Sequence, residues 1–227
     1  MDRANACADD RGQGVSETPT HPWADPSVSL TGARSLAYEY ILPRVPAGAS
    51  VLDVGAGRAP LARLLRAVGC RVMAVDSNID RLSEAHAGQD YPIHAGDVRK
   101  GLSGIPGAPW DVIATVYASQ HCQGAEARLW ANLRDVVAPD GLWLWVGRHT
   151  ATPRREVGRS DPCNGYGIDG LYTLAHASGW GVESASVRLG WYNGGAFGWT
   201  DDLTAASVMC ATLRPLLDWN GATGMVP

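Results

Sequence analysis

Apolar residues recur along the middle of the chain in two alternating periods. Five short apolar runs have the length of β-strands, at 50–54, 71–75, 91–95, 111–116 and 142–147. Between them, apolar positions spaced three or four residues apart indicate amphipathic helices, at 61–68, 80–86 and 125–137. Strands that alternate with helices need right-handed crossovers, so the pattern predicts a parallel sheet covered by helices. We expect the Pro139–Gly141 turn to end the helix over 125–137.

The two ends of this region complete the predicted fold. A helix is expected over residues 31–42, where Pro43 stops it, and another over 168–177, which Gly179 closes. Two long β-type runs follow at 181–192 and 203–213, and the loop that joins them is short and carries no helical pattern. Such runs pair as an antiparallel hairpin. The sequence therefore predicts an α/β fold with a mostly parallel seven-stranded sheet and a C-terminal antiparallel hairpin.

Length and composition favour one domain with an N-terminal extension. The 227 residues, 45% of them hydrophobic, suffice for one well-buried core. Residues 1–30 are rich in Asp, Gly, Thr and Pro with little periodicity, which predicts a flexible tail that could order over a ligand as a lid. Residues 31–227 are expected to form the folded domain.

Charge and cysteine usage narrow the partners and the compartment. With 19 Lys and Arg against 23 Asp and Glu, the net charge of −4 makes nucleic acid an unfavoured partner. The five cysteines are odd in number and scattered, without the spacing of a zinc site, which favours reduced thiols in the cytoplasm. No stretch approaches the roughly 20 apolar residues that span a membrane. We expect a cytoplasmic protein that does not contact membranes.

The first strand runs directly into a glycine turn. In the segment Val51–Pro60, Asp53 is followed by Gly55, Ala56 and Gly57 before a helix begins. Glycine permits a tight turn and close approach of a ligand at the carboxyl ends of the strands, where open α/β sheets bind ligands. The same pattern also suits a plain strand-to-helix turn, so the turn alone predicts little.

Acidic residues at three successive strand ends sharpen the prediction. Asp53 lies in the first strand, Asp76 ends the second and Asp97 follows the third. Each of them could instead be a helix cap or a turn residue. Because carboxyl ends of parallel strands meet at one edge, however, the three carboxylates together predict a ligand site there.

A nicotinamide dinucleotide site is the main alternative on this fold. Asp76 lies about 20 residues past the glycines, where such sites carry a ribose-binding acid. Pro60 stands where the third glycine of the dinucleotide fingerprint is expected, and the charge of Asp53 suits a cation better than a pyrophosphate. These two features argue against a dinucleotide.

With these motifs the chain resembles the class I S-adenosylmethionine (SAM) dependent methyltransferases, which have a Rossmann-like fold. The resemblance covers residues 35–147 by motif and reaches residue 213 by strand order. It implies SAM as cofactor and S-adenosylhomocysteine as product. The implied cofactor contacts are Asp53 at the methionine end, Gly55, Ala56 and Gly57 beneath it, Asp76 on the ribose hydroxyls with Ser77 and Asn78 beside it, and Asp97 and Val98 at the adenine.

The loop after the fourth strand is where the family places the methyl group. Within it, His121 could accept a proton near neutral pH, and Tyr117 could contact cofactor or substrate. His149, just past the fifth strand, is the other candidate base. Capping, packing or a solvated loop position are the alternatives for these side chains. The predicted catalytic residues are therefore His121, Tyr117 and His149.

The substrate is predicted by exclusion. The fourth-strand loop lacks the Asn/Asp-Pro-Pro-aromatic motif of amino-methylating DNA enzymes, and Asp161–Cys163 lies in the wrong loop for a cytosine C5 nucleophile. No metal site is evident, so we expect a metal-free enzyme acting on a small organic acceptor such as a specialised metabolite. A tRNA or protein acceptor, and a non-catalytic SAM-fold scaffold, remain open. Aromatic residues around the hairpin loop could form a substrate wall or a homodimer contact: Trp191, Tyr192, Phe197 and Trp199.

Overall fold

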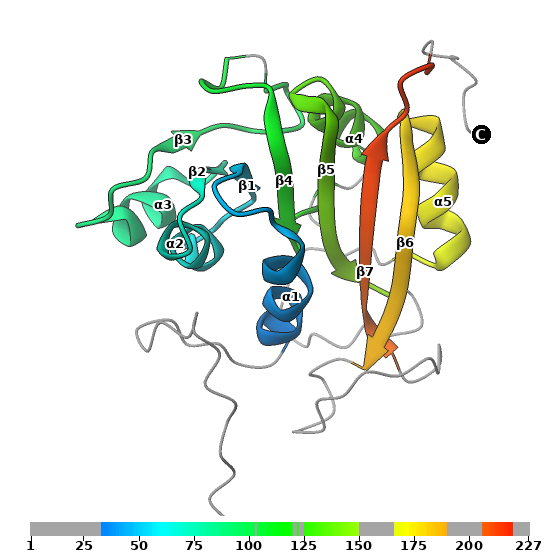
Figure 1. Cartoon of the computed structure of the whole chain (residues 1–227), viewed down its shortest axis with the longest axis horizontal. Coiled ribbons are helices and arrows are strands. Elements are labelled where there is room, and N and C mark those ends of the chain that lie inside the picture. The colour runs from blue at the N-terminus through cyan, green and yellow to red at the C-terminus, as the bar shows by residue number, and fades with distance from the viewer. Residues whose placement is uncertain are drawn as a thin grey trace, which may run out of the picture.

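The computed structural model describes residues 33–102, 104–119, 122, 125–149, 166–189 and 206–219. Helices flank a central sheet in this part of the chain (Figure 1). The elements run in the order α1 (Ala33–Ile41), the 3₁₀ helix η1 (Leu42–Arg44), β1 (Ser50–Val54), α2 (Pro60–Ala67), β2 (Arg71–Asp76), α3 (Ile79–His86), β3 (Ile93–Ala95), β4 (Trp110–Val116), α4 (Glu126–Arg134), β5 (Val137–Arg148), α5 (Ile168–Ala177), β6 (Trp180–Leu189) and β7 (Ala206–Pro215).

The seven strands form one mixed sheet in the order β3-β2-β1-β4-β5-β7-β6. Strands β1 to β5 are parallel to their neighbours. Strand β7 is antiparallel to both β5 and β6, between which it lies. This arrangement confirms the predicted α/β fold with a mostly parallel sheet and an antiparallel C-terminal strand pair.

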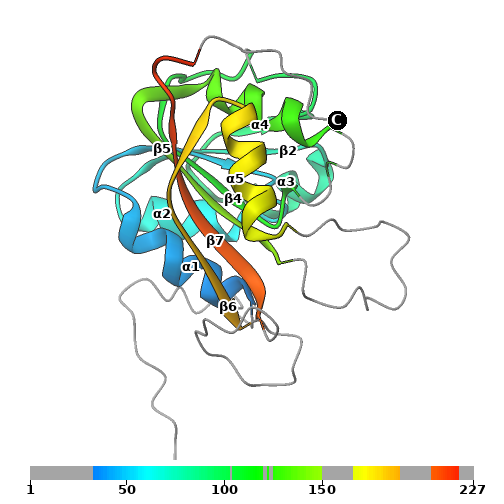
Figure 2. The ribbon, with the colours of Figure 1, turned by 90° about the vertical axis from the view of Figure 1, so that its right-hand side faces the viewer.

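Each face of the sheet has its own hydrophobic core. Helices α1 and α2 cover one face, and α4 and α5 cover the other, as the view in Figure 2 shows. Leu82 of α3 joins the core beneath α1 and α2. The segment between β3 and β4 contributes Leu102 and Ile105 to the opposite core. The inner strands are consequently apolar on both faces, as parallel strands covered by helices are.

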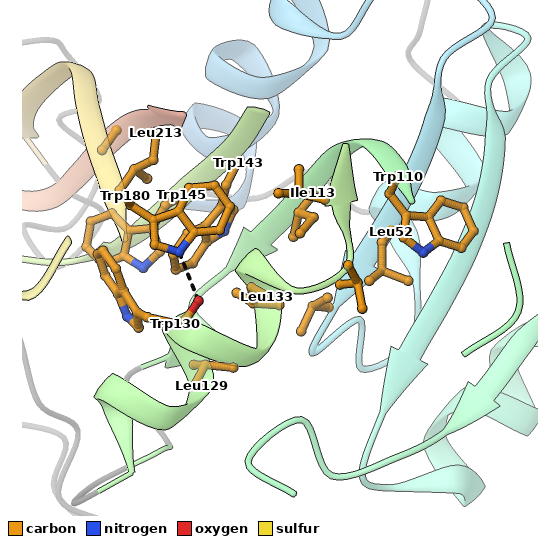
Figure 3. Packing of buried hydrophobic residues seen from close by; sticks show 14 of the residues in the cluster. Leu52, Trp110, Ile113, Leu129, Trp130, Leu133, Trp143, Trp145, Trp180 and Leu213 are labelled. Carbon is orange, nitrogen blue, oxygen red and sulfur yellow. Dashed lines mark hydrogen bonds between the residues drawn. The ribbon is translucent and has the colours of Figure 1, made fainter. Parts of the chain in front are cut away.

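A cluster of tryptophans fills the core between the sheet and helices α4 and α5 (Figure 3). Trp143 and Trp145 lie on the same face of β5, and both are fully buried. The ring of Trp130 in α4 meets Trp143 edge-on at 4.6 Å between centroids, and Trp180 lies 5.2 Å from Trp143. Buried indoles need acceptors for their N–H groups. Those of Trp143 and Trp145 donate to the hydroxyls of Thr115 at 3.0 Å and Ser119 at 2.9 Å.

The predicted boundary between the helix at 125–137 and the next strand is wrong. Helix α4 ends at Arg134, and β5 already begins at Val137, so Pro139–Gly141 lies within the strand span. Trp110 pairs with Val137, but Val112 pairs with Leu142, so the extra residues of β5 form an irregularity in the ladder. This break lets β5 continue past a proline that a regular inner strand would exclude.

Some predictions fall outside the described residues. These include the tail at 1–30 and the aromatic residues 191–199 near the hairpin loop. Within the described part, no helix is long and apolar enough to cross a membrane.

Candidate functional site

Three aspartates reach one edge of the sheet from neighbouring strands. Asp53 lies in β1, Asp76 is the last residue of β2, and Asp97 comes two residues after β3 ends. These strands are adjacent and parallel, so their carboxyl ends lie side by side, about 4.8 Å apart from strand to strand. The structure therefore brings the three predicted residues to the same edge.

The turn after β1 requires glycine for two different reasons. Gly55 and Gly57 have φ values of +70° and +58°, a region that side chains rarely adopt. A Cβ at Gly55 would collide with the Cβ of Ala118 in the loop after β4, whereas a Cβ at Gly57 would have no neighbour within 4 Å. The N–H groups of Gly55 and Ala56 both donate to the Val75 carbonyl, at 2.8 and 3.0 Å. The turn is thus bound to β2 by hydrogen bonds and packs against the loop after β4. The space beside Gly57 stays open.

Asp76 connects the end of β2 to this turn. Its Oδ2 accepts a hydrogen bond from the Gly57 N–H at 2.8 Å, and its Oδ1 accepts one from the Asn78 N–H at 2.8 Å. The side chain is only half-buried, and Ser77 and Asn78 are exposed. Each carboxylate oxygen has more than one acceptor position, so Asp76 can take further hydrogen bonds while the backbone holds it in place.

Asp53 is the buried carboxylate of the site. Its side chain accepts a hydrogen bond from the Ala62 N–H at 3.1 Å, at the N-terminal turn of α2. Burial raises the pKa of Asp53 to about 7, and the charge of Asp76 acts in the same direction, while the bond from Ala62 lowers it. Asp53 can therefore change its charge near neutral pH when a cation approaches.

Asp97 forms an ion pair that the sequence did not predict. The Arg99 guanidinium donates from two nitrogens to the two oxygens of Asp97, each at 2.8 Å. This pairing holds the pKa of Asp97 below its usual value. The neighbouring Val98 is half-buried, and its carbonyl accepts a hydrogen bond from Asn132 in α4 at 2.7 Å. The loop after β3 is thus fixed by a side-chain ion pair within the loop and by a hydrogen bond from α4 to its backbone.

The carboxyl ends of β4 and β5 form the adjoining part of this edge. Tyr117 is half-buried and has a φ of +55°, an unusual value for a side-chain-bearing residue that often marks a functional position. His149 is buried at 5% exposure and forms a β-bridge with Tyr166, so it is not a solvated loop residue. His121, the other candidate base, lies outside the described residues.

Three contacts in this region were not predicted from the sequence. They are the packing of Gly55 on Ala118, the ion pair of Arg99, and the bridge between His149 and Tyr166. Two of them join residues far apart in the chain. Among the residues described, no group of three or more His, Cys, Asp or Glu side chains is placed to hold a metal ion.

Residues 32–155 match a protein-family model described as a methyltransferase domain. No curated protein sequence matches the chain significantly. Among solved structures, a TehB-like SAM-dependent methyltransferase from Corynebacterium glutamicum shares 16% identity over 79% of this chain and 86% of its own, with a TM-score of 0.60. The 1,6-didemethyltoxoflavin-N1-methyltransferase of Burkholderia thailandensis, with bound 1,6-didemethyltoxoflavin and S-adenosylhomocysteine, shares 18% identity over 81% and 76%, with a TM-score of 0.57.

A third similar structure comes from a complex of the Haloferax volcanii Trm112 methyltransferase activator with a methyltransferase. It shares 13% identity over 80% of this chain and 91% of its own, with a TM-score of 0.63. At these low identities the structures establish a common fold. The family match over more than half of the chain confirms the resemblance drawn from the glycine turn and the three aspartates.

Proposed function

Because the chain belongs to the methyltransferase-domain family, we propose that it transfers a methyl group from SAM to a small organic acceptor. SAM is the cofactor and S-adenosylhomocysteine the product. The relative that binds 1,6-didemethyltoxoflavin acts on a small heterocycle, and the net charge of −4 is unfavourable for a polyanionic acceptor. Both observations support a small acceptor over a nucleic acid.

The observation that carries the proposal is the bond between the Asp76 carboxylate and the N–H of Gly57. It places an anchored acceptor group beside the open space at Gly57. Asp76 would bind the ribose hydroxyls through its remaining acceptor positions, with Ser77 and Asn78 beside it. Gly55, Ala56 and Gly57 would lie beneath the cofactor.

The other two aspartates suit the two ends of the same cofactor. Asp53 would lie near the methionine end, where its negative charge favours an ammonium or sulfonium cation. Asp97 would accept from the adenine amino group while sharing its oxygens with Arg99, and Val98 would pack on the ring. On this assignment, Asp76 and Asp97 would follow one another along the edge as ribose and adenine do in the cofactor.

When bound, SAM supplies a methyl group on a positively charged sulfur, which needs an aligned nucleophile more than covalent help. The residues at the ends of β4 and β5 would provide this alignment. Tyr117, through its constrained backbone, would contact the cofactor or the acceptor. His121 and His149 would be the candidates to accept a proton from an acceptor that begins protonated.

The cofactor assignment is tested by replacing Asp76 and measuring SAM affinity by calorimetry. Asp76→Ala should weaken binding by at least roughly 1.5 kcal/mol, because charge-assisted hydrogen bonds are lost. Asp135→Ala is a matched control, because Asp135 is an exposed carboxylate at the end of α4. Equal affinities for the wild type and Asp76→Ala would refute the ribose assignment.

The catalytic assignment is tested with histidine variants. An acceptor is first identified by screening small molecules for release of S-adenosylhomocysteine. His121→Ala should lower turnover with little change in SAM affinity, and His149→Ala serves as the comparison between the two candidate bases. Unaffected turnover in a variant would remove that histidine as the base.

A further inference from the structure

Asp97, the residue assigned to the adenine amino group, has most of its acceptor positions filled from within its own loop. Its Oδ1 accepts from the Arg99 Nε at 2.8 Å and from the Arg99 backbone N–H at 3.1 Å. Its Oδ2 accepts from a terminal nitrogen of the same guanidinium at 2.8 Å. A carboxylate has about four acceptor positions, two on each oxygen. Within the described chain, the bonds from Arg99 therefore leave one position open, on Oδ2.

Arg99 alone sets the direction of that open position, because it makes every one of these bonds. The side chains are 46% exposed for Arg99 and 20% exposed for Asp97, so the pair lies at the surface, where ion pairs add little to stability. A guanidinium that donates from two nitrogens to two oxygens does, however, fix the geometry of the carboxylate. The contribution of Arg99 is thus to orientation more than to stability.

The backbone of the loop is held without the Arg99 side chain. The Lys100 N–H donates to the Asp97 carbonyl at 2.8 Å. The Val98 carbonyl accepts from the Asn132 side chain in α4 at 2.7 Å. Loss of the guanidinium is therefore expected to let the Asp97 carboxylate rotate while the chain around it stays in place.

An acceptor of fixed direction distinguishes an amino group from a carbonyl group. Adenine carries an exocyclic amino group that donates, whereas hypoxanthine has an oxygen there and a hydrogen on the adjacent ring nitrogen. A carboxylate that can turn is able to follow that hydrogen and to accept from either base. The bonds from Arg99 prevent this rotation, and they also lower the pKa of Asp97, so its carboxylate has no proton to donate to the hypoxanthine oxygen.

We propose that Arg99 is a positioning residue that makes the cofactor site specific for adenine over hypoxanthine, by holding the open acceptor position of Asp97 toward the adenine amino group. This rests on the proposed function, because that function places adenine beside Asp97. Arg99 acts through the carboxylate in this role and need not contact the base.

The test compares S-adenosylhomocysteine with S-inosylhomocysteine, which has hypoxanthine in place of adenine. Calorimetry measures the affinity of the full chain for each at neutral pH. The wild type should prefer S-adenosylhomocysteine by about tenfold or more, the value of a hydrogen bond to a charged group. Arg99→Gln should reduce this preference to about threefold or less, because the freed carboxylate accepts from both bases. Arg99→Lys keeps the charge without the two-nitrogen fork and should lie between the two.

Arg66→Gln is the matched control. Arg66 in α2 forms the same type of pair with Asp90, through its Nε at 3.0 Å and a terminal nitrogen at 2.6 Å. This pair is also at the surface, with side chains 41% and 68% exposed. Asp90 precedes β3, whereas Asp97 follows it, so the control pair lies at the other end of the same strand. Its removal should leave the preference unchanged.

The outcomes separate this inference from the proposed function. A wild type that fails to bind S-adenosylhomocysteine contradicts the proposed function itself. Asp97→Asn should lose the preference, because an amide can accept from one base and donate to the other. A preference that survives in Asp97→Asn, or a wild type that binds both ligands equally, contradicts the adenine assignment within that function.

Two results overturn the inference alone. One is a preference that is lost in Asp97→Asn but stays complete in Arg99→Gln. The other is an Arg99→Gln variant that binds both ligands more weakly in an unchanged ratio, which is what a merely structural role predicts. Thermal melting shows whether Arg99→Gln is folded, and if it is not, an undiminished preference in Arg99→Lys overturns the inference instead.

Discussion

Asp53 shows at the scale of one residue how the proposed binding role would oppose stability. The carboxyl group is 3% exposed and has one hydrogen bond among the described residues, from Ala62. Burial makes its charged form costly, which is why its pKa rises to about 7. A bound cation would favour the ionised form, so the residue carries a cost in the free protein that binding can relieve.

This cost predicts a specific pH dependence of stability. The folded protein holds the Asp53 proton more tightly than the unfolded chain, whose pKa is near 3.8. Its contribution to stability is therefore full below about pH 4 and is lost as the pH rises through about 7. At about 1.4 kcal/mol per pKa unit, the loss amounts to at most roughly 4 kcal/mol.

Replacing Asp53 with Asn removes the titrating group and keeps an oxygen that can accept from Ala62. We expect urea unfolding to give similar stabilities for Asp53→Asn and wild type at pH 4, and a more stable variant at pH 8. The difference between the two proteins isolates Asp53 from other carboxyls such as Asp97 and Asp111, whose pKa values are lowered. Parallel stability curves from pH 4 to 8 would contradict the assignment.

At the scale of elements, the glycine turn after β1 and the loop after β4 are one packing unit. Both glycines of the turn have positive φ, but only Gly55 also lies against a neighbour, the Cβ of Ala118. Gly55→Ala and Gly57→Ala should share a backbone cost of about 1–2 kcal/mol. Gly55→Ala should lose more stability, because a collision with Ala118 is added.

A second substitution tests the origin of this difference. Ala118→Gly removes the atom that collides, so the double variant Gly55→Ala/Ala118→Gly should regain part of the stability lost in Gly55→Ala. Chemical unfolding of the four proteins gives the coupling between the two sites. Strictly additive losses would show that the two segments do not pack as the structure has them.

What the sequence could predict at this scale was the order and type of the elements. Periodicity located the α-helices and strands of the described chain to within a few residues, apart from the start of β5, because the buried faces of regular elements repeat; it did not predict the 3₁₀ helix η1. It failed at Pro139–Gly141, because a proline and a glycine usually end an element. Here they lie in an irregularity of β5, and β4 pairs with β5 on both sides of it. The aspartates were found because each follows an apolar run. The bridge of Tyr166 to His149 and the packing of Ala118 on Gly55 could not be found, because each joins segments that are separated in the chain.

At the scale of the whole molecule, a polar contact connects the N-terminal helix to a C-terminal strand. It is a hydrogen bond that joins Tyr40 of α1 to Thr212 of β7, with 2.8 Å between the two hydroxyl oxygens. The residues are 172 positions apart, and both are buried, at 5% and 7% exposure. Strand β7 lies between β5 and β6 and is antiparallel to both. This bond therefore connects α1 to the antiparallel part of the sheet.

Removing one hydroxyl leaves the other buried without its partner. Tyr40→Phe and Thr212→Val should therefore each destabilise the protein by about 1–3 kcal/mol. The double variant replaces both hydroxyls with apolar atoms of similar shape, so it should be more stable than the sum of the two losses implies. Tyr40→Phe keeps the ring on which the Arg44 guanidinium packs, 4.0 Å from the centroid, so that contact does not confound the comparison. A double-mutant cycle by urea unfolding measures the coupling, and a coupling energy near zero would mean that α1 and β7 are held together by apolar packing alone.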